Sequence, residues 1–398
     1  MRNPEQSGYA GLTGNETVLV VNAGSSSLKL QFLPQRLGVQ IERIGEDSDN
    51  GAPPPASHLE AFRVGLRQLK ADSGGLVPVA VGHRVVHGGE QFRKPVLIDD
   101  EVLAAVEDLG RIAPLHNPAG LQAISAARTE LPGVPHVAVF DTAFHADLPE
   151  QSYLTGLPWR YYEEEGIRNY GFHGSNHDHV TATAADHLGR PRSELKIISL
   201  HLGNGASAAA VRYGRSYDTS MGFTPLAGLL MGSRTGDLDP GIILHLLRGG
   251  LGTEELSTLL NRESGLKGIS GVSNDLRDIR KAAAAGNRRA QAAISVYTMR
   301  IIKAVGAEAA AMEGVDAIVF TGGAGENDTQ LRADVLRGMR WLGVELDEDA
   351  NSRNATFIST DGSPVKALVV PADEEGLIAR QALALLQTKK RERVKARW

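Results

Sequence analysis

The 398-residue chain has a mass of 42.4 kDa, 42% hydrophobic and 22% charged residues, and a formal net charge of -5. This composition is typical of a globular protein with a full core, and at about 150 residues per domain the length predicts two domains. The lack of cysteine excludes disulfides, thiolate metal sites and a cysteine nucleophile. No apolar run reaches the ~18 residues that span a bilayer, and mild acidity gives no electrostatic reason to bind nucleic acid. We therefore expect a cytoplasmic protein with neither a membrane nor a nucleic-acid partner.

The first half opens with a strand, a turn of small residues and a second strand. Val18–Val21 is continuously apolar and predicts a buried strand, and Leu28–Phe32 alternates as a second one. The turn between them, NAGSSS, offers backbone N–H groups, hydroxyls and the following Lys29 to a phosphate. An ordinary serine-rich hairpin is the alternative. The Walker A spacing is not met.

The same plan returns far downstream. Lys196–Leu202 predicts a strand, residues 203–207 (GNGAS) a turn, and residues 208–213 a second strand. The turn formally matches G-x-G-x-x-A, but that dinucleotide motif requires a helix at once, and here a strand follows. A third glycine turn, residues 321–327, follows the predicted strand 316–320. Three such turns in one chain indicate a nucleotide cradle.

Helical patterns cover residues 100–111, 177–188 and 287–312. Strands that alternate with helices predict a mixed α/β architecture, and the repeated strand–turn–strand unit predicts two domains on one plan. The break between them is expected near residues 147–156, and the proline-rich stretch 49–57 is expected to be a loop.

Three histidines, His173, His177 and His179, have a spacing that invites a zinc site. The alternative is a helix capped by Ser175 or Asn176, which would place His177 and His179 on different faces. With no cysteine available, we favour the helix and keep His173, in a glycine-flanked turn, as a candidate for contact with a transition state.

Charged side chains also stand in suggestive places. Arg84 and Arg234 each lie among glycines, which favours anion binding over a surface ion pair. Asp141 ends the predicted strand 137–140, where it is either a helix cap or a catalytic carboxylate. Glu374 and its neighbour Glu375 follow another strand and are either solvated or available to magnesium through water.

The chain as a whole resembles the acetokinase family, within the acetate and sugar kinase, heat-shock chaperone and actin superfamily. The resemblance is carried, in order, by VLVVNAGSSSLK, GHRVVHGGE, APLHNP, VFDTAFH, YGFHGSNH, HLGNGAS, DTSMGFTPL, MGSRTGDLDPG, SNDLRDI, FTGGAGEN and PADEE.

This resemblance implies two duplicated ribonuclease-H-like (actin-like ATPase) α/β domains with a cleft between them that holds ATP and substrate. The domains are expected over residues 1–148, joined by a C-terminal helix 380–398, and over residues 149–379. The implied activity is reversible, Mg2+-dependent, in-line transfer of the ATP γ-phosphoryl group to acetate, giving acetyl phosphate and ADP. Mn2+ is expected as a substitute metal and a homodimer as the assembly. The alternatives are a propionate or butyrate kinase of the same family, and a chaperone-like ATPase that makes no acyl phosphate.

Residue roles follow from the same resemblance. It implies catalytic roles for Asp141, His173 and Arg234, and a magnesium site at Asn22 and Glu374. It implies that substrate is bound by Arg84, Val86, Leu115, His116, Phe172 and Pro225. It implies that the nucleotide is bound by Ser25, Ser27, Lys29, His201, Leu202, Gly203, Asn204, Gly205, Asp275, Leu276, Arg277, Gly323, Ala324, Gly325, Glu326 and Asn327.

The chain departs from the family pattern at three places. Ala227 stands where an acidic residue is common, Asp218 where asparagine is usual, and PADEEG lacks Thr-Asn before its glutamates. The last departure leaves open whether Glu374 or Glu375 faces the metal. Because acetate is already ionised at neutral pH, we expect Asp141 to orient other groups rather than to remove a proton.

Overall fold

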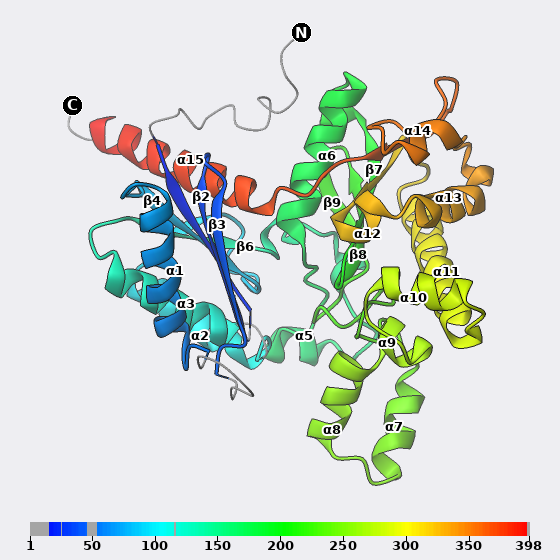
Figure 1. Cartoon of the computed structure of the whole chain (residues 1–398), viewed down its shortest axis with the longest axis horizontal. Helices are drawn as coiled ribbons and strands as arrows, with labels where there is room; N and C mark the ends of the chain where they lie inside the picture. Colours follow the sequence, from blue (N-terminus) through cyan, green and yellow to red (C-terminus); the bar gives the residue numbers. More distant parts are fainter. Residues whose placement is uncertain (1–15, 25, 46–53, 115–116, 396–398) are drawn as a thin grey trace. The chain divides into compact units, whose positions relative to one another are not determined.

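The computed structural model describes residues 16–24, 26–45, 54–114 and 117–395. Its contacts divide the chain into two compact units, one of Met1–Ala143 with Asp373–Trp398 and one of Phe144–Ala372 (Figure 1). These divisions fall at 143 and 372, where the sequence suggested 148 and 379. No helix in the described part of the chain is long and apolar enough to cross a membrane.

In its described residues, the first unit contains a six-stranded sheet and four α-helices. Its strands are β1 (Val18–Ala23), β2 (Ser27–Leu33), β3 (Leu37–Glu42), β4 (Ala80–Val85), β5 (Val96–Leu97) and β6 (His136–Phe140). Its helices are α1 (His58–Asp72), α2 (Asp100–Asp108), α3 (Asn117–Glu130) and α15 (Glu374–Lys395). The sheet order is β3-β2-β1-β4-β6-β5. Strands β1, β2 and β3 are antiparallel, β4 and β6 run parallel to β1, and β5 pairs antiparallel with β6.

Strand β1 separates the two layers of the core in this unit. Leu19 and Val21 pack into a cluster with α1 and α3, whereas Val18 and Val20 pack against α15. Alternation along a strand sends successive side chains to opposite faces, and each fully buried aliphatic side chain contributes about 1.5–3 kcal/mol. A buried strand covered on both sides by helices is the result.

The C-terminal helix α15 belongs to the first unit although it is the last element of the chain (Figure 1). It packs on β1, β4 and β6. At Gly82 of β4 a Cβ atom would lie 2.7 Å from Ile378 of α15, so only glycine permits this close approach. The helix begins at Glu374, six residues before the expected start at 380.

The second unit contains a five-stranded sheet. Its strands are β7 (Lys196–Leu202), β8 (Ala206–Arg212), β9 (Arg215–Thr219), β10 (Ala317–Thr321) and β11 (Lys366–Val369). Its α-helices are α4 (Glu150–Tyr153), α5 (Arg160–Glu165), α6 (Gly174–Leu188), α7 (Pro240–Arg248), α8 (Thr253–Thr258), α9 (Gly265–Ser270), α10 (Leu276–Ala284), α11 (Arg288–Ala311), α12 (Gly322–Asn327), α13 (Thr329–Gly338) and α14 (Glu348–Ser352). Across the chain, 3-10 turns occur at Leu109–Arg111, Ala143–His145, Arg192–Glu194 and Arg340–Leu342, and a π-helical turn at Leu259–Glu263.

The two sheets share one plan. The order β9-β8-β7-β10-β11 repeats β3-β2-β1-β4-β6, with three antiparallel strands followed by two parallel ones. Helix α6 packs its buried residues on one face of this sheet, and α11 packs against β8. The predicted mixed α/β class with duplicated ribonuclease-H-like units is confirmed.

Three local predictions are wrong. Ser175 and Asn176 do not cap the helix, because α6 begins at Gly174 and includes both of them. Residues 321–327 are not an open glycine turn, because Gly322–Asn327 forms helix α12, in which the Glu326 carboxylate accepts a hydrogen bond from the Gly322 N–H. The expected helix 100–111 ends at Asp108 and continues only as a 3-10 turn.

Candidate active site

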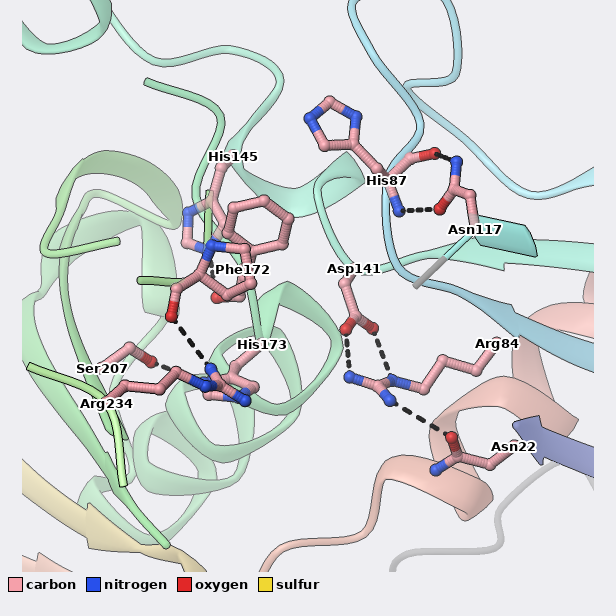
Figure 2. A network of polar contacts seen from close by, with 11 residues as sticks. Asn22, Arg84, His87, Asn117, Asp141, His145, Phe172, His173, Ser207 and Arg234 are labelled. Atoms are coloured by element: carbon pink, nitrogen blue, oxygen red, sulfur yellow. Dashed lines mark hydrogen bonds and ion pairs between the residues drawn. The ribbon is translucent and has the colours of Figure 1, made fainter. Parts of the chain in front are cut away.

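In the first unit, three neighbouring strands bring together an arginine, a carboxylate and an amide. Arg84 lies in β4, Asp141 directly follows β6, and Asn22 lies near the end of β1. The Arg84 guanidinium donates from Nε to Asp141 Oδ1 (3.1 Å), from Nη2 to Oδ2 (2.5 Å) and from Nη1 to Asn22 Oδ1 (3.2 Å), as Figure 2 shows. The planar guanidinium is therefore held at both ends.

This pair is electrostatically strong because it is shielded from water. Asp141 is 2% exposed, and the bidentate geometry is the strongest form of the arginine–carboxylate contact. Burial opposes the charge of Arg84, but Asp141, with Glu374 and Glu375, raises the pKa of the guanidinium above its usual value. Arg84 is thus a permanent, oriented positive charge.

A second ion pair lies beside it. Lys29 of β2, which stands opposite Asn22 in the sheet, pairs with Glu375 of α15. Glu374, one residue earlier, contributes to the electrostatic potential at Arg84. Of the two neighbouring glutamates, Glu375 is therefore the one that pairs with a lysine in the described part of the chain.

The segment after β4 is held by a buried amide. Asn117, 1% exposed, accepts from the His87 N–H (3.2 Å) and donates to the His87 carbonyl (3.2 Å) and to that of Val106 (3.3 Å), as drawn in part in Figure 2. Val86, a predicted substrate residue, is buried next to this anchor.

In the second unit, His173 is positioned by the backbone that precedes α6. It occupies the N-cap position in the left-handed region (φ 55°), a conformation that costs energy in a non-glycine residue. Gly171, at φ 75°, makes this turn possible, because a Cβ there would lie 2.6 Å from the His145 ring. His145 in turn faces the Phe172 carbonyl (3.1 Å) and Ser216 Oγ (2.7 Å).

The His173 ring belongs to a chain of hydrogen bonds. Its Nδ1 lies 2.9 Å from Ser207 Oγ, which lies 2.8 Å from His177 Nε2, and His177 Nδ1 lies 2.9 Å from Ser199 Oγ. Burial, with the neighbouring His145 and His201, lowers the pKa of His177 well below its usual value, so His177 is neutral. Burial also lowers the pKa of His145, to about 4.

Arg234 and His173 lie on the same side of the turn between β7 and β8. A Cβ built on Gly205 would be 3.4 Å from His173 Nε2 and 3.7 Å from Arg234 Nη1, so the glycine lets the backbone approach both side chains. Arg234 Nη1 also donates to the Pro225 carbonyl (2.9 Å). The predicted residues His173, Gly205 and Arg234 therefore lie close together, and Arg234 also contacts the predicted residue Pro225.

The remainder of that turn is tightly bonded to its surroundings. The Gly203 N–H donates to the Gly205 carbonyl (2.9 Å), and Asn204 receives bonds from Gly232 (2.9 Å) and from the Asn274 amide (2.9 Å). The His201 ring stacks on His173 with 4.2 Å between centroids and bonds to Asn176 (2.9 Å). Leu202 is buried.

In the two other segments that the sequence predicts to bind nucleotide, many polar groups bond to one another. Asp275 caps α10 by accepting from the Arg277 N–H (2.8 Å) and pairs with the Arg277 guanidinium, which lowers the pKa of Asp275. In α12, the Glu326 carboxylate accepts from the Gly322 and Ala372 N–H groups.

Asn327 is similarly bonded, because its amide donates to the Gly323 carbonyl (2.9 Å). In this segment Gly323 is exposed and Ala324 is half-buried, whereas Gly325 is buried, and the carbonyls of all three accept hydrogen bonds within the protein. Leu276 is buried behind Asp275 as part of the core.

Some predicted residues are not placed in either group. Ser25, Leu115 and His116 lie outside the described residues. Ser27 lies in β2, close enough to Gly24 that a Cβ there would meet its Oγ at 2.7 Å, and the Phe172 side chain is buried.

Sequence reasoning did not identify the residues that hold the candidate site residues in place through hydrogen bonds. The linking hydroxyls Ser199 and Ser207 and the buried Arg332 were not proposed, and His177 was considered only as a metal ligand or as a residue of a helix. A sequence signal existed for Ser207 alone, which is the last residue of the predicted glycine turn 203–207.

The first unit contains oxygen donors, which are the ligands that Mg2+ prefers. Asn22 Oδ1, with one lone pair engaged by Arg84, and the Glu374 carboxylate are hard oxygen ligands, and Mg2+ characteristically binds one or two carboxylates and keeps several waters. Among the described residues, no group of three or more His, Asp or Glu side chains could hold a metal ion by itself. The donor set therefore fits a metal that shares its coordination with substrate and water.

Two ribonuclease-H-like units that carry arginine, histidine and glycine turns at their strand ends define a phosphoryl-transfer class of protein. The sequence profile of the acetokinase family matches residues 17–380, and the chain belongs to this family. It is 50% identical over 390 residues to an acetate kinase of Clavibacter michiganensis subsp. michiganensis, covering 92% of this chain and 98% of the relative.

Solved structures agree with this assignment. The crystal structure of Porphyromonas gingivalis acetate kinase superposes with a TM-score of 0.86 at 42% identity, covering 93% of this chain and all of that one. A propionate kinase of Francisella tularensis subsp. tularensis superposes with a TM-score of 0.86 at 36% identity, covering 92% and 98%.

Proposed function

We propose that this chain is an acetate kinase, which reversibly transfers the γ-phosphoryl group of ATP to acetate to give acetyl phosphate and ADP. The observation that carries the proposal is the permanently charged Arg84, held in bidentate contact by the buried Asp141. A fixed planar guanidinium suits a small carboxylate substrate. The chain is also 50% identical over 390 residues to an acetate kinase, and this similarity supports the same activity.

In this mechanism Arg84 binds the acetate carboxylate, and Asp141 orients Arg84. Both Asp141 oxygens accept from the guanidinium, which supports an orienting role rather than proton removal. Acetate is ionised at neutral pH and attacks phosphorus without a base. Val86, Leu115, His116, Phe172 and Pro225 supply the remaining substrate contacts, with the apolar members against the methyl group.

His173 and Arg234 act on the phosphoryl group in flight. Phosphoryl transfer passes through a loose transition state with charge on its equatorial oxygens, so positioned positive charge and N–H donors accelerate it. Their approach to Gly205 supports a shared target.

We propose that the nucleotide is held by Ser25, Ser27 and Lys29, by residues 201–205 and 275–277, and by residues 323–327. A bound Mg2+, with Mn2+ as a substitute, would be held by Asn22 and Glu374 and would neutralise phosphate charge. The pairing of Glu375 with Lys29 supports Glu374 as the metal ligand.

The proposed location is the cytoplasm, and the proposed assembly is a homodimer. Helix α7 supports the homodimer, because it has no buried residue and exposes Ile242, Leu244 and Leu247 by 43%, 51% and 36%. Apolar side chains grouped in this way mark interaction surfaces.

The test is to trap acyl phosphates with hydroxylamine, using ATP, Mg2+ and, in turn, acetate, propionate and butyrate. We expect a hydroxamate from acetate, a smaller yield from propionate because one methylene changes binding by only about 1–3 kcal/mol, and the least from butyrate. ATP hydrolysis without hydroxamate would favour a chaperone-like ATPase. A preference for propionate would favour the alternative named for the Francisella relative.

The matched variant is Arg84→Lys, which keeps the charge but loses the planar fork. We expect it to raise the KM for acetate about tenfold and to leave the KM for ATP within about twofold.

A further inference from the structure

The largest fully buried side chain in the described part of the chain is a positive one. Arg332 of α13 is 0% exposed and forms no ion pair with any residue that the structure describes. Burying a charge is costly unless every polar atom is bonded, so a buried arginine needs a reason.

All five donors of Arg332 are used, and every acceptor is an uncharged oxygen. Its Nη1 donates to the carbonyls of Gly325 (2.9 Å) and Glu326 (2.8 Å), both in helix α12. Its Nε and Nη2 donate to Asn351 (2.8 and 3.1 Å), and Nη2 also donates to Asn354 Oδ1 (2.6 Å). The guanidinium therefore joins α12 to α14 and the residues just after it.

Helix α12 needs such support. It is six residues long with glycine at three positions, and an interior glycine destabilises a helix relative to alanine. The last carbonyls of a helix have no partner within it and carry partial negative charge, which is where Arg332 donates. Burial lowers the pKa of Arg332 and Asp328 opposes this, so the group stays charged at neutral pH.

The opposite end of α12 is fixed by other contacts. Gly322, at φ 77°, packs so closely on the Leu202 backbone that a Cβ would lie 3.1 Å away, and the Glu326 carboxylate ties the Gly322 and Ala372 N–H groups together. Arg332 holds the end that these contacts leave unsupported.

We propose that Arg332 is a positioning residue for nucleotide binding, which sets the place of α12 so that Gly323, Ala324 and Gly325 contact ATP. The inference rests on the proposed nucleotide role of this segment. Contact through backbone and small side chains cannot adjust by rotamer changes, so a shift of the helix is expected to weaken nucleotide binding directly.

The experiment compares Arg332→Met and Arg332→Lys with Asn354→Gly. The last variant removes one acceptor but keeps both bonds to α12, and glycine accepts the backbone of Asn354 at φ 52°. For each variant, the KM for ATP, the KM for acetate and the Kd for ADP by calorimetry are measured.

We expect Arg332→Met to raise the KM for ATP and the Kd for ADP at least tenfold, with the KM for acetate within twofold. Arg332→Lys, which retains charge and part of the bonding, should raise both nucleotide constants about threefold, and Asn354→Gly should change neither by more than twofold. If Arg332→Met does not fold, Arg332→Lys decides. Unchanged nucleotide constants in the folded lysine variant, or equal losses for acetate and ATP, would overturn the proposal.

Gly323→Val separates this inference from the nucleotide assignment. A Cβ on Gly323 meets nothing within 4 Å, so the fold should tolerate the substitution. We expect a raised KM for ATP. Without that rise the segment is not a nucleotide site and the proposed nucleotide role fails; with it, and with unchanged Arg332 variants, only the positioning role fails.

Discussion

The hydroxyl of Ser207 links two histidines of the second unit by hydrogen bonds. A hydroxyl donates one hydrogen bond, and it lies between His173 Nδ1 and His177 Nε2. A neutral His177 donates through one ring nitrogen and accepts through the other, so the chain runs either from Ser199 through His177 and Ser207 to His173 Nδ1, or in reverse. The proposed contact of His173 Nε2 with a phosphoryl oxygen requires the first direction, in which Ser207 donates to His173 Nδ1 and the His173 proton is on Nε2.

We therefore expect Ser207→Ala to lower kcat about tenfold, or about 1.4 kcal/mol, with both KM values within twofold. Ser199→Ala is the matched control, since it removes a buried hydroxyl that contacts only His177 among these histidines, and its effect should be smaller. Steady-state kinetics of both variants decide the matter. A loss in Ser199→Ala as large as in Ser207→Ala would indicate general damage to the core rather than orientation of His173.

At this scale the sequence indicates candidate substrate-binding residues but not the residues that hold them in place. Arg84 and Asp141 stand out because each has an unusual place, among glycines or at a strand end. Ser207 and Arg332 do not, since their importance arises from partners 30 or 34, and 6 to 22, residues away in sequence. Hydrogen bonds between distant segments leave no local pattern.

At the scale of elements, strands were predictable wherever burial and periodicity agree. β1 and β2 follow the apolar run and the alternation directly. Helix α12 was not, because its glycines favour a turn and its stability comes from Glu326 inside it and Arg332 outside it. The start of α6 was misplaced for a similar reason, since His173 adopts a left-handed conformation at the N-cap with no side-chain cap.

Helix α7 carries the element-scale prediction. We expect the wild-type chain to sediment at twice 42.4 kDa, and Leu244→Asp to sediment at 42.4 kDa, because a buried unpaired carboxylate in an apolar contact is costly. Glu254→Gln on α8 is a charge-changing control outside the apolar set. An unaltered mass for Leu244→Asp would place the subunit contact elsewhere.

At the scale of the whole molecule, one plan is used twice with different chemistry at its strand ends. In the first sheet Arg84 lies in β4 and Asp141 directly follows the parallel strand β6, and the guanidinium that Asp141 holds is suited to a carboxylate. In the second, β10 leads into the glycine helix α12 and β7 into the glycine turn, which suit phosphates. The repeated pattern is visible in the sequence as two strand–turn–strand units. The different chemical character of the strand ends in the two sheets became clear only from the side-chain contacts.

Both units also bury histidines, and this makes the stability of the chain depend on pH. Burial lowers the pKa values of His83, His136 and His177, and that of His145 to about 4, against an ordinary value near 6.5. The unfolded chain therefore takes up protons first as the pH falls, so the stability supported by neutral histidines is complete above about pH 6.5 and declines toward pH 4. Burial raises the pKa of Glu308 well above its usual value, which has the opposite effect. The pH dependence of the free energy of unfolding of the whole chain therefore combines contributions of opposite sign.

A difference between two chains isolates His145. Its ring bonds to Ser216 and to the Phe172 carbonyl make the wild type more stable than His145→Gln at pH 7.5. Since only the wild type carries the titrating ring, the advantage should shrink by about 2 kcal/mol between pH 7.5 and pH 5, as the unfolded histidine gains a proton that the folded one refuses. Urea unfolding of both chains at half-unit pH steps measures this difference, and Glu308 cancels because both chains contain it. A gap that stays constant over this range would mean that His145 is protonated as readily in the folded chain as in the unfolded one.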